Sequence, residues 1–324
     1  MPGAEGATDL PDLADIRAAH TRIAGLVHRT PVMTCASIDA EVGAALHFKC
    51  EHLQTIGAFK ARGACNAVYC LPDDVATRGV VTHSSGNHGA AIAYAASRRG
   101  IPAWVVMPEN APQVKQDNVR RFGARVRICA PTVAAREAAC ADVERETGAS
   151  LVHPFDDSRV IAGQGTVALE LLAAAPDLDV VVAPCGGGGL LSGTAIAVRS
   201  VSPKTQVIGA EPANADDAAR SFASGRLEAL ATTTTIADGL RTSLAPRTLA
   251  AIKAHVGALH TCSEQGIVRA MRMIFERMKQ VVEPSAAVAL AILLEHRTAV
   301  RGLRVGVILS GGNVDLDRLP WLPR

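Results

Sequence analysis

The sequence predicts an α/β protein with open, mostly parallel twisted sheets that carry helices on both faces. Short apolar runs alternate with segments of helical period along almost the whole chain, and parallel sheets with crossover helices produce this alternation. Hydrophobic residues make up 48% of the 324 residues and aromatic residues only 3%, which indicates a large aliphatic core. Three apolar runs end in glycine-rich or polar turns, and ligands of open α/β sheets bind at the carboxyl ends of strands.

Each predicted element follows from the period of its apolar residues and from the turn residues that bound it. The expected strands are short apolar runs at residues 45–50, 79–82, 103–107, 125–129, near Leu151, 180–183, 206–210 and 305–309. The expected helices are 12–26, 60–70, 87–99, 113–122, 132–147, 161–174 and one from Leu190, with several more after residue 210. Neither a linker nor an internal repeat is visible, so composition alone places no domain boundary.

Composition argues against several classes of function. The net charge of +2 provides no basic excess for nucleic acid, and no block of like charge forms a tail. The eight cysteines lack a CxxC pair, which fits a reducing cytosol better than a disulfide framework or a zinc site. Residues 1–9 lack the pattern of a signal peptide, and proline and glycines interrupt the apolar stretch 180–198. We therefore expect a cytoplasmic protein without nucleic-acid or membrane partners.

Lys60 is the candidate catalytic residue, because it begins a predicted helix directly after Phe59 and a turn that contains Gly57. The positive end of the helix dipole and burial both disfavour a protonated amine, so both would make Lys60 more nucleophilic at neutral pH. A lysine that forms a Schiff base needs this property. Taken alone, Lys60 is more simply interpreted as a solvated lysine, and its assignment depends on the turns described next.

Two turns follow predicted strands and precede predicted helices. Residues 186–189 are four consecutive glycines, whose N–H groups and following helix N-terminus predict a phosphate cradle; the alternative is a flexible turn or a close helix contact. This turn lacks the lysine of a P-loop and the spacing of a dinucleotide site. Residues 82–89 carry hydroxyl and amide groups that could bind a carboxylate, or that simply cap the helix. The last strand ends in a third polar turn, which begins at Ser310.

These stretches together resemble the serine/threonine dehydratase and serine racemase family, the fold type II enzymes that use pyridoxal 5′-phosphate. The resemblance extends over nearly the whole chain, and its specificity comes from many motifs in one order. The motifs are His28-Arg29-Thr30-Pro31, Lys49-Cys50-Glu51, Ala58-Phe59-Lys60, Ser84-Ser85-Gly86-Asn87-His88-Gly89, His153-Pro154-Phe155-Asp156, Ala162-Gly163-Gln164-Gly165-Thr166, the tetraglycine turn, Val282-Glu283-Pro284-Ser285 and Ser310-Gly311-Gly312-Asn313.

The resemblance implies a fold like that of the tryptophan synthase β subunit, with two α/β domains and a homodimeric assembly. Residues 1–78 and 158–324 would form the large cofactor-binding domain, and residues 79–157 a small domain that closes over the active site. Lys60 would bind the cofactor covalently and move the Cα proton. The other cofactor-binding residues that the resemblance implies are Phe59 beside the ring, Asn87 at the phenolic oxygen, Gly186, Gly187, Gly188, Gly189 and Leu190 at the phosphate, and Ser310 at the pyridine nitrogen.

The resemblance also implies residues for the substrate and for a cation. Ser84, Ser85, Asn87 and His88 are similar to the family's carboxylate-binding turn, and Ser85 to the serine opposite the lysine in serine racemases. Arg136 is similar to an arginine that faces the distal end of the substrate, although a surface arginine is an equally good interpretation. Glu211, the Ala215 carbonyl and Asp217 resemble a divalent-cation site, whose oxygen ligands suit Mg²⁺ or Ca²⁺, with Mn²⁺ also possible; the alternative is a solvated acidic loop.

The implied activity is elimination of water from a β-hydroxy α-amino acid, which gives a 2-oxo acid and ammonia. A neutral serine at the pyridine nitrogen stabilises a carbanion less than an aspartate would, and this favours substrates whose leaving group departs promptly. Serine, threonine, 3-hydroxyaspartate and phenylserine all remain open as substrates. Phe155 is more similar to the dehydratases and Ser85 to the racemases. The alternatives are an amino-acid racemase with side elimination activity and a non-catalytic phosphate-binding regulator.

Overall fold

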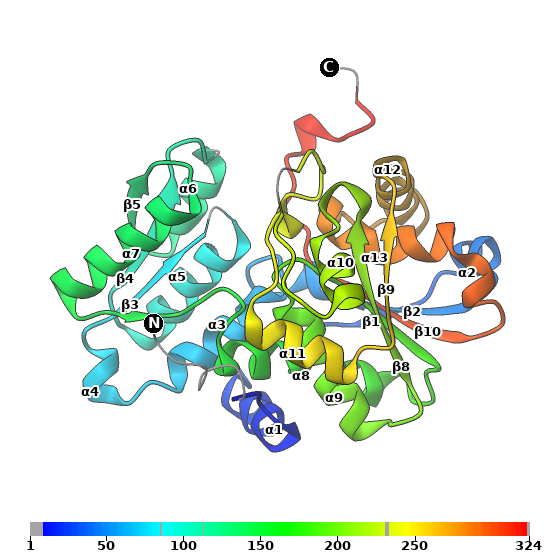
Figure 1. Ribbon diagram of the computed structural model, residues 1–324, viewed down its shortest axis with the longest axis horizontal. Coiled ribbons are helices and arrows are strands. Elements are labelled where there is room, and N and C mark those ends of the chain that lie inside the picture. Colours follow the sequence, from blue (N-terminus) through cyan, green and yellow to red (C-terminus); the bar gives the residue numbers. More distant parts are fainter. Residues whose placement is uncertain (1–8, 85, 112, 231–232, 323–324) are drawn as a thin grey trace.

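The computed structural model describes residues 9–84, 86–111, 113–230 and 233–322, and it confirms the α/β class (Figure 1). The strands are β1 Val32–Met33, β2 Ala45–Cys50, β3 Val80–His83, β4 Ala103–Pro108, β5 Arg125–Cys129, β6 Ser150–Leu151, β7 Val180–Pro184, β8 Gln206–Pro212, β9 Ala258–Cys262 and β10 Arg304–Leu309. The α-helices are α1 Leu13–Arg22, α2 Ala36–Val42, α3 Lys60–Tyr69, α4 Asp73–Ala76, α5 Asn87–Arg99, α6 Gln113–Arg121, α7 Val133–Thr147, α8 Ser158–Ala174, α9 Gly189–Val201, α10 Asp217–Ser224, α11 Pro246–His255, α12 Glu264–Met273 and α13 Pro284–Glu295.

The strands form two separate sheets. The larger is six-stranded with the order β1-β2-β10-β7-β8-β9, and the smaller is four-stranded with the order β5-β4-β3-β6. Every pairing between these strands is parallel except that of β1 with β2. All strands of the smaller sheet come from residues 80–151, while the larger sheet uses chain from before and after them. The division into domains 1–78 with 158–324 and 79–157 agrees with this arrangement and remains our proposal.

Two edge strands of the larger sheet were not predicted from the sequence. β1 has only two residues, too few to show an alternating pattern. All residues of β9 except Cys262 are only partly buried, so this strand lacks the continuous apolar run of a central parallel strand. The apolar stretch 180–198 forms β7, a turn and α9, as predicted. Within the described ranges, no helix combines the length and apolar character that crossing a bilayer requires.

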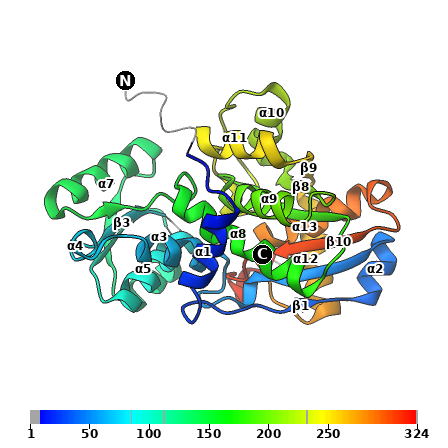
Figure 2. The ribbon, with the colours of Figure 1, turned by 90° about the horizontal axis from the view of Figure 1, so that it is seen from below.

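Helix α3 lies between the two sheets and packs against α5 on one side and α8 on the other. Ala61, Ala64 and Val68 of α3 are completely buried, in the same apolar cluster as α5 and β4. α1 packs against α8, and Figure 2 shows both helices between the two halves of the molecule. The residue at the start of α3 is therefore held between groups from both sheets.

Candidate active site

The start of α3 is tied to the carboxyl end of β10. The backbone N–H of Phe59 donates a 2.9 Å hydrogen bond to the carbonyl oxygen of Ser310, and Ala58 forms an isolated antiparallel bridge with Gly311. Lys60 is the first residue of the helix. Ser310 is buried, so the predicted partner of the pyridine nitrogen and the predicted catalytic lysine belong to one rigid junction.

The amine of Lys60 is directed toward the smaller sheet. Its Nζ atom donates a 2.8 Å hydrogen bond to the carbonyl oxygen of Pro154 and lies 5.2 Å from the centre of the Phe59 ring. Burial lowers the pKa of Lys60 to about 8. An amine with this pKa is neutral in a useful fraction of molecules near neutral pH, which nucleophilic and general-base catalysis require.

The tetraglycine turn joins β7 to α9 at the edge of the larger sheet where the strands end. Gly188 caps α9 with a φ of +87°, a conformation that favours glycine. The backbone N–H groups in the first turn of a helix have no partner within the helix, so those of Gly189 and Leu190 are available to an anion. Leu190 is itself buried, which leaves its backbone as the group that can bind.

Side chains are excluded on both sides of this turn. A Cβ atom on Gly187 would lie 2.3 Å from the Phe155 ring, and one on Gly188 would lie 2.7 Å from the Leu244 side chain. A Cβ on Gly186 would lie 3.0 Å from the Cα of Leu240. Only glycines fit between these neighbours, so this buried turn has only backbone groups to offer a ligand.

One short segment connects Lys60 with the glycine turn. The carbonyl oxygen of Pro154 accepts the hydrogen bond from Lys60, and the next residue, Phe155, places its ring against Gly187. Lys60 and the glycine turn are more than 120 residues apart in the sequence. Pro154 and Phe155 nevertheless contact both of them. Covalent attachment and phosphate binding can therefore act on one small molecule.

Asn87 begins α5 and connects the smaller sheet to the end of β10. Its amide nitrogen donates to both carboxylate oxygens of Glu283, at 2.8 and 3.1 Å, and its oxygen accepts a 2.9 Å hydrogen bond from Asn313. The Glu283 backbone N–H donates to the carbonyl oxygen of Gly311 at 3.0 Å. The Asn87 amide is therefore held in one orientation by groups of the larger sheet.

The described residues of the turn between β3 and α5 offer a substrate carboxylate mainly backbone N–H groups. The Ser84 hydroxyl accepts a 3.1 Å hydrogen bond from the Gly86 N–H. The His88 ring is buried, its Nε2 atom faces the carbonyl oxygen of Val152 at 3.3 Å, and burial lowers its pKa well below the usual value. A neutral, inward-facing imidazole is a poor carboxylate ligand, so His88 would contribute its backbone N–H at the N-terminus of α5. Ser85 lies outside the described residues.

Two further histidines, His83 and His153, contact each other near Lys60. The Nδ1 atom of His153 accepts the backbone N–H of Asp156 at 2.9 Å, and burial lowers the pKa of His153 to about 4. The His83 ring meets the His153 ring edge-on, with centroids 5.4 Å apart. Burial, followed by the charge of Arg136, lowers the pKa of His83, so the half-buried guanidinium of α7 acts on the end of β3.

Glu211 and Asp217 form a pair of buried carboxylates whose charges act on Cys185, the residue before the glycine turn. Glu211 ends β8 and accepts the backbone N–H groups of Ala218 and Ala219 at 3.0 and 2.9 Å. Neither carboxylate oxygen of Asp217 has a hydrogen-bond partner among the described residues. Burial raises the pKa of Glu211 to about 8 and that of Asp217 to about 6. Ala215 is buried beside them in a short 3₁₀ helix, Ala213–Ala215.

This geometry agrees with what a comparison against protein families finds. The family described as "Pyridoxal-phosphate dependent enzyme" matches residues 23–311, which include Lys60, the glycine turn and Ser310. The chain belongs to the family of pyridoxal-phosphate dependent enzymes. The predicted resemblance to fold type II enzymes is confirmed.

Relatives within this family are similar over almost their whole length. A β-hydroxyaspartate dehydratase of Paracoccus denitrificans is 50% identical over 312 residues, which are 96% of this chain and 99% of the relative. A serine racemase of Arabidopsis thaliana is 48% identical over 95% of both chains. The solved structure of maize serine racemase superposes with a TM-score of 0.93 at 46% identity and covers 95% of both chains. Each match therefore includes both sheets, α3 and the glycine turn.

The residues of the site fit pyridoxal phosphate. The glycine turn provides backbone donors in a cradle that no side chain could share, as a phosphate requires. Lys60 provides a half-buried amine of low pKa, which a covalent link to an aldehyde requires. The residues predicted to bind a cation offer two carboxylates, and the described residues contain no group of three or more His, Cys, Asp or Glu side chains that could hold a metal ion.

The structure adds residues that the sequence did not assign to the site. Glu283 and Asn313 hold Asn87, and His153 contacts the His83 ring and is close enough to Lys60 for its pKa to be affected by the Lys60 charge. Their motifs were recognised in the sequence, but no spacing rule joins residues so far apart. A fourth missed feature is a cluster of buried charges behind Lys60, which is described below.

Proposed function

We propose that the protein is a pyridoxal-phosphate dependent dehydratase that eliminates water from a β-hydroxy α-amino acid to give a 2-oxo acid and ammonia. The observation that carries this proposal is the half-buried Lys60 amine, which lies against the Pro154 carbonyl oxygen and whose low pKa allows it to act as a base at neutral pH. The 50% identity to a β-hydroxyaspartate dehydratase over nearly the full length of both chains supports the same reaction.

In this proposal the residues around Lys60 have separate roles. Gly186–Gly189 and the Leu190 N–H hold the phosphate, Phe59 lies beside the ring, and Asn87 and Ser310 bind its phenolic oxygen and nitrogen. When bound, pyridoxal phosphate supplies the electron sink for the charge left at Cα. Lys60 would take the Cα proton and pass it to the departing hydroxyl, which leaves as water. The Ser310 hydroxyl is a neutral partner, and this favours a leaving group that departs promptly.

We propose 3-hydroxyaspartate as the substrate class, because two positive features lie near the end of β3. The α-carboxylate would bind at the turn of Ser84 and Asn87, where the N-terminus of α5 provides N–H donors. A second carboxylate would pair with Arg136, whose charge already acts on His83 at the end of β3. Serine and threonine lack the second carboxylate and would leave Arg136 without a carboxylate partner.

We also propose a divalent cation, Mg²⁺, Ca²⁺ or Mn²⁺, at Glu211, the Ala215 carbonyl and Asp217. The unpartnered oxygens of Asp217 and the pKa raised by burial at both carboxylates support this assignment, since a cation would offset the cost of their charge. A homodimer is a further proposal, supported by the exposed Phe275 side chain beside Trp321. All eight cysteines are free thiols, which supports a cytoplasmic location.

An amino-acid racemase is the second candidate, and the 48% identity to a serine racemase favours it. Racemisation needs an acid on the face opposite Lys60, and Ser85 would supply it. The decisive assay measures 2-oxo acid release and D-enantiomer formation with serine, threonine, 3-hydroxyaspartate and phenylserine. We expect oxo-acid release to be fastest with 3-hydroxyaspartate. Faster formation of a D-amino acid than of oxo acid would favour the racemase, and absence of a bound chromophore would favour a phosphate-binding regulator.

A further inference from the structure

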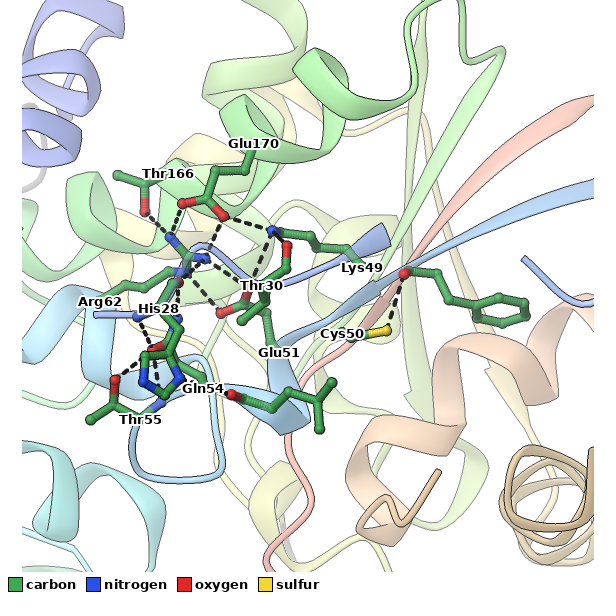
Figure 3. A network of polar contacts seen from close by, with 12 residues as sticks. His28, Thr30, Lys49, Cys50, Glu51, Gln54, Thr55, Arg62, Thr166 and Glu170 are labelled. Carbon is green, nitrogen blue, oxygen red and sulfur yellow. Dashed lines mark hydrogen bonds and ion pairs between the residues drawn. The ribbon is translucent and has the colours of Figure 1, made fainter. Parts of the chain in front are cut away.

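Four charged side chains meet in the interior behind α3 (Figure 3). Lys49, Glu51 and Arg62 have no exposed surface, and Glu170 is 6% exposed. They come from β2, the turn after β2, α3 and α8, so the cluster joins the larger sheet to two helices. With two cations and two carboxylates the cluster is neutral overall.

Arg62 is the centre of this cluster. Its Nε and Nη2 atoms donate to the two carboxylate oxygens of Glu51 at 2.7 and 2.9 Å. Its Nη1 and Nη2 atoms donate to the two oxygens of Glu170, both at 2.8 Å. Nη1 also donates to the Thr166 hydroxyl at 3.2 Å, and Nη2 to the His28 carbonyl oxygen at 3.3 Å. Two bidentate pairs fix a planar guanidinium in both position and orientation.

Lys49 completes the cluster from the sheet side. Its amine donates 2.6 Å hydrogen bonds to Glu170 and to the carbonyl oxygen of Thr30. Burial opposes the charge of Glu170, but its hydrogen bonds with Arg62 and Lys49 hold its pKa below the usual value. Glu170 therefore stays ionised and able to bind Arg62.

Arg62 and Lys60 project from opposite sides of α3. Residues two apart in an α-helix are rotated by about 200° about its axis, so the side chain of Arg62 leaves the helix on the side away from Lys60. The structure agrees: Lys60 reaches Pro154, whereas Arg62 reaches Glu170 of α8. A change in the position of Arg62 would consequently move the helix, and Lys60 with it.

The backbone of α3 is also pressed against α8 directly beside Arg62. A Cβ on Gly63 would lie 2.8 Å from the carbonyl oxygen of Val160, and one on Gly163 would lie 2.6 Å from the Cα of Gly63. The Gly63 N–H donates to the Gln164 side chain at 3.2 Å. This contact sets the distance between the two helices, and the charges fix the rotation and register of α3.

We propose that Arg62 is a positioning residue. It acts through α3 to hold the Lys60 amine in place between the end of β10 and the carbonyl oxygen of Pro154. The charge cluster holds α3 from behind, while the hydrogen bond from Phe59 to Ser310 holds it from the front. The inference depends on the proposed role of Lys60. Catalysis would then also depend on the charge cluster around Arg62, which does not contact the substrate.

The test compares Arg62→Lys with Arg99→Lys in the full-length holoenzyme. Lysine keeps the charge but cannot form two bidentate pairs. Arg99 is a matched control. It donates to the backbone carbonyl oxygens of Val68 in α3 and Leu71 just after it, at the end of the helix away from Lys60. We expect Arg62→Lys to lower kcat about tenfold with little change in KM, and to shift the visible absorbance of the bound cofactor and its pH midpoint. Arg99→Lys should change neither.

A charge-balanced variant keeps the test decisive if Arg62→Lys does not fold. Lys49→Met with Glu170→Gln removes one charge of each sign, keeps the pair of Arg62 with Glu51, and should give a smaller change in the same direction. Loss of thermal stability with unchanged kcat, absorbance and pH midpoint would overturn the proposal, because the cluster would then be merely structural. Lys60→Ala separates the two failures: if that variant remains active, the proposed function itself is wrong.

Discussion

The Lys60 amine donates a 2.8 Å hydrogen bond to the carbonyl oxygen of Pro154, which belongs to the segment that leaves the smaller sheet. Lys60 is anchored on the other side, because Phe59 beside it is bonded to Ser310 at the end of the larger sheet. The lysine thus lies at the junction of the two sheets. If the two sheets move relative to each other when the protein closes over a substrate, the surroundings of the Lys60 amine will change.

The pH dependence of cofactor uptake tests the environment of Lys60. Burial lowers the pKa of Lys60 to about 8, and only the neutral amine can attack an aldehyde. We expect the rate of reconstitution of cofactor-free protein to rise about tenfold per pH unit below pH 8 and to level off above it. Stopped-flow absorbance from pH 6.5 to 10.5 measures this rate. A rate that keeps rising to pH 10 would indicate an ordinary solvated lysine.

Arg136 is expected to select substrates with a second carboxylate. Arg136→Leu should reduce kcat/KM for 3-hydroxyaspartate about 100-fold and leave that for serine within about threefold, because one charge-assisted pair is lost. Arg145→Leu is the control, since Arg145 lies on the same helix and its side chain is 71% exposed. Equal losses for both substrates would mean that Arg136 supports the fold instead of reading the substrate.

Chelation is expected to destabilise the protein through the Asp217 site. A cation at about 100 times its Kd adds about 2.7 kcal/mol of stability, so its removal should lower Tm by about 4 °C. Restoring Mg²⁺ or Ca²⁺ should reverse the change in wild type but not in Asp217→Asn. Asp216→Asn is the control, because its carboxylate pairs with Arg220 at 2.9 Å on the same loop. An identical melting curve in chelator and cation would argue for a plain acidic loop.

Stability should fall in mild acid because His153 is held neutral. Burial lowers its pKa to about 4, so the unfolded chain, with a pKa near 6.5, binds more protons between these values. The free energy of unfolding should therefore be fully retained above about pH 6.5 and lower by about 2 kcal/mol at pH 5. His153→Asn should flatten this dependence, and His20→Asn, at an exposed position, should not. Denaturant titrations at several pH values decide between these outcomes.

The sequence predicted the turns of the site better than the contacts between them. The turns that begin at Ser84, Gly186 and Ser310 follow strands, and their residue types carry the signal locally. The bond between Arg62 and Glu170 joins residues 108 positions apart, and only the packing of α3 on α8 brings them together. Burial is likewise a property of the folded chain, so the sequence could not predict that the His88 ring faces inward.

The most direct test of the account is the rate of 2-oxo acid release from 3-hydroxyaspartate by Lys60→Ala, compared with wild type. Lys60 is proposed as both the covalent anchor of the cofactor and the base that takes the Cα proton. We therefore expect the rate to fall at least about 1,000-fold while the thermal unfolding midpoint stays within a few degrees. If the folded variant eliminates water at a rate near that of wild type, Lys60 is not the base that takes the Cα proton.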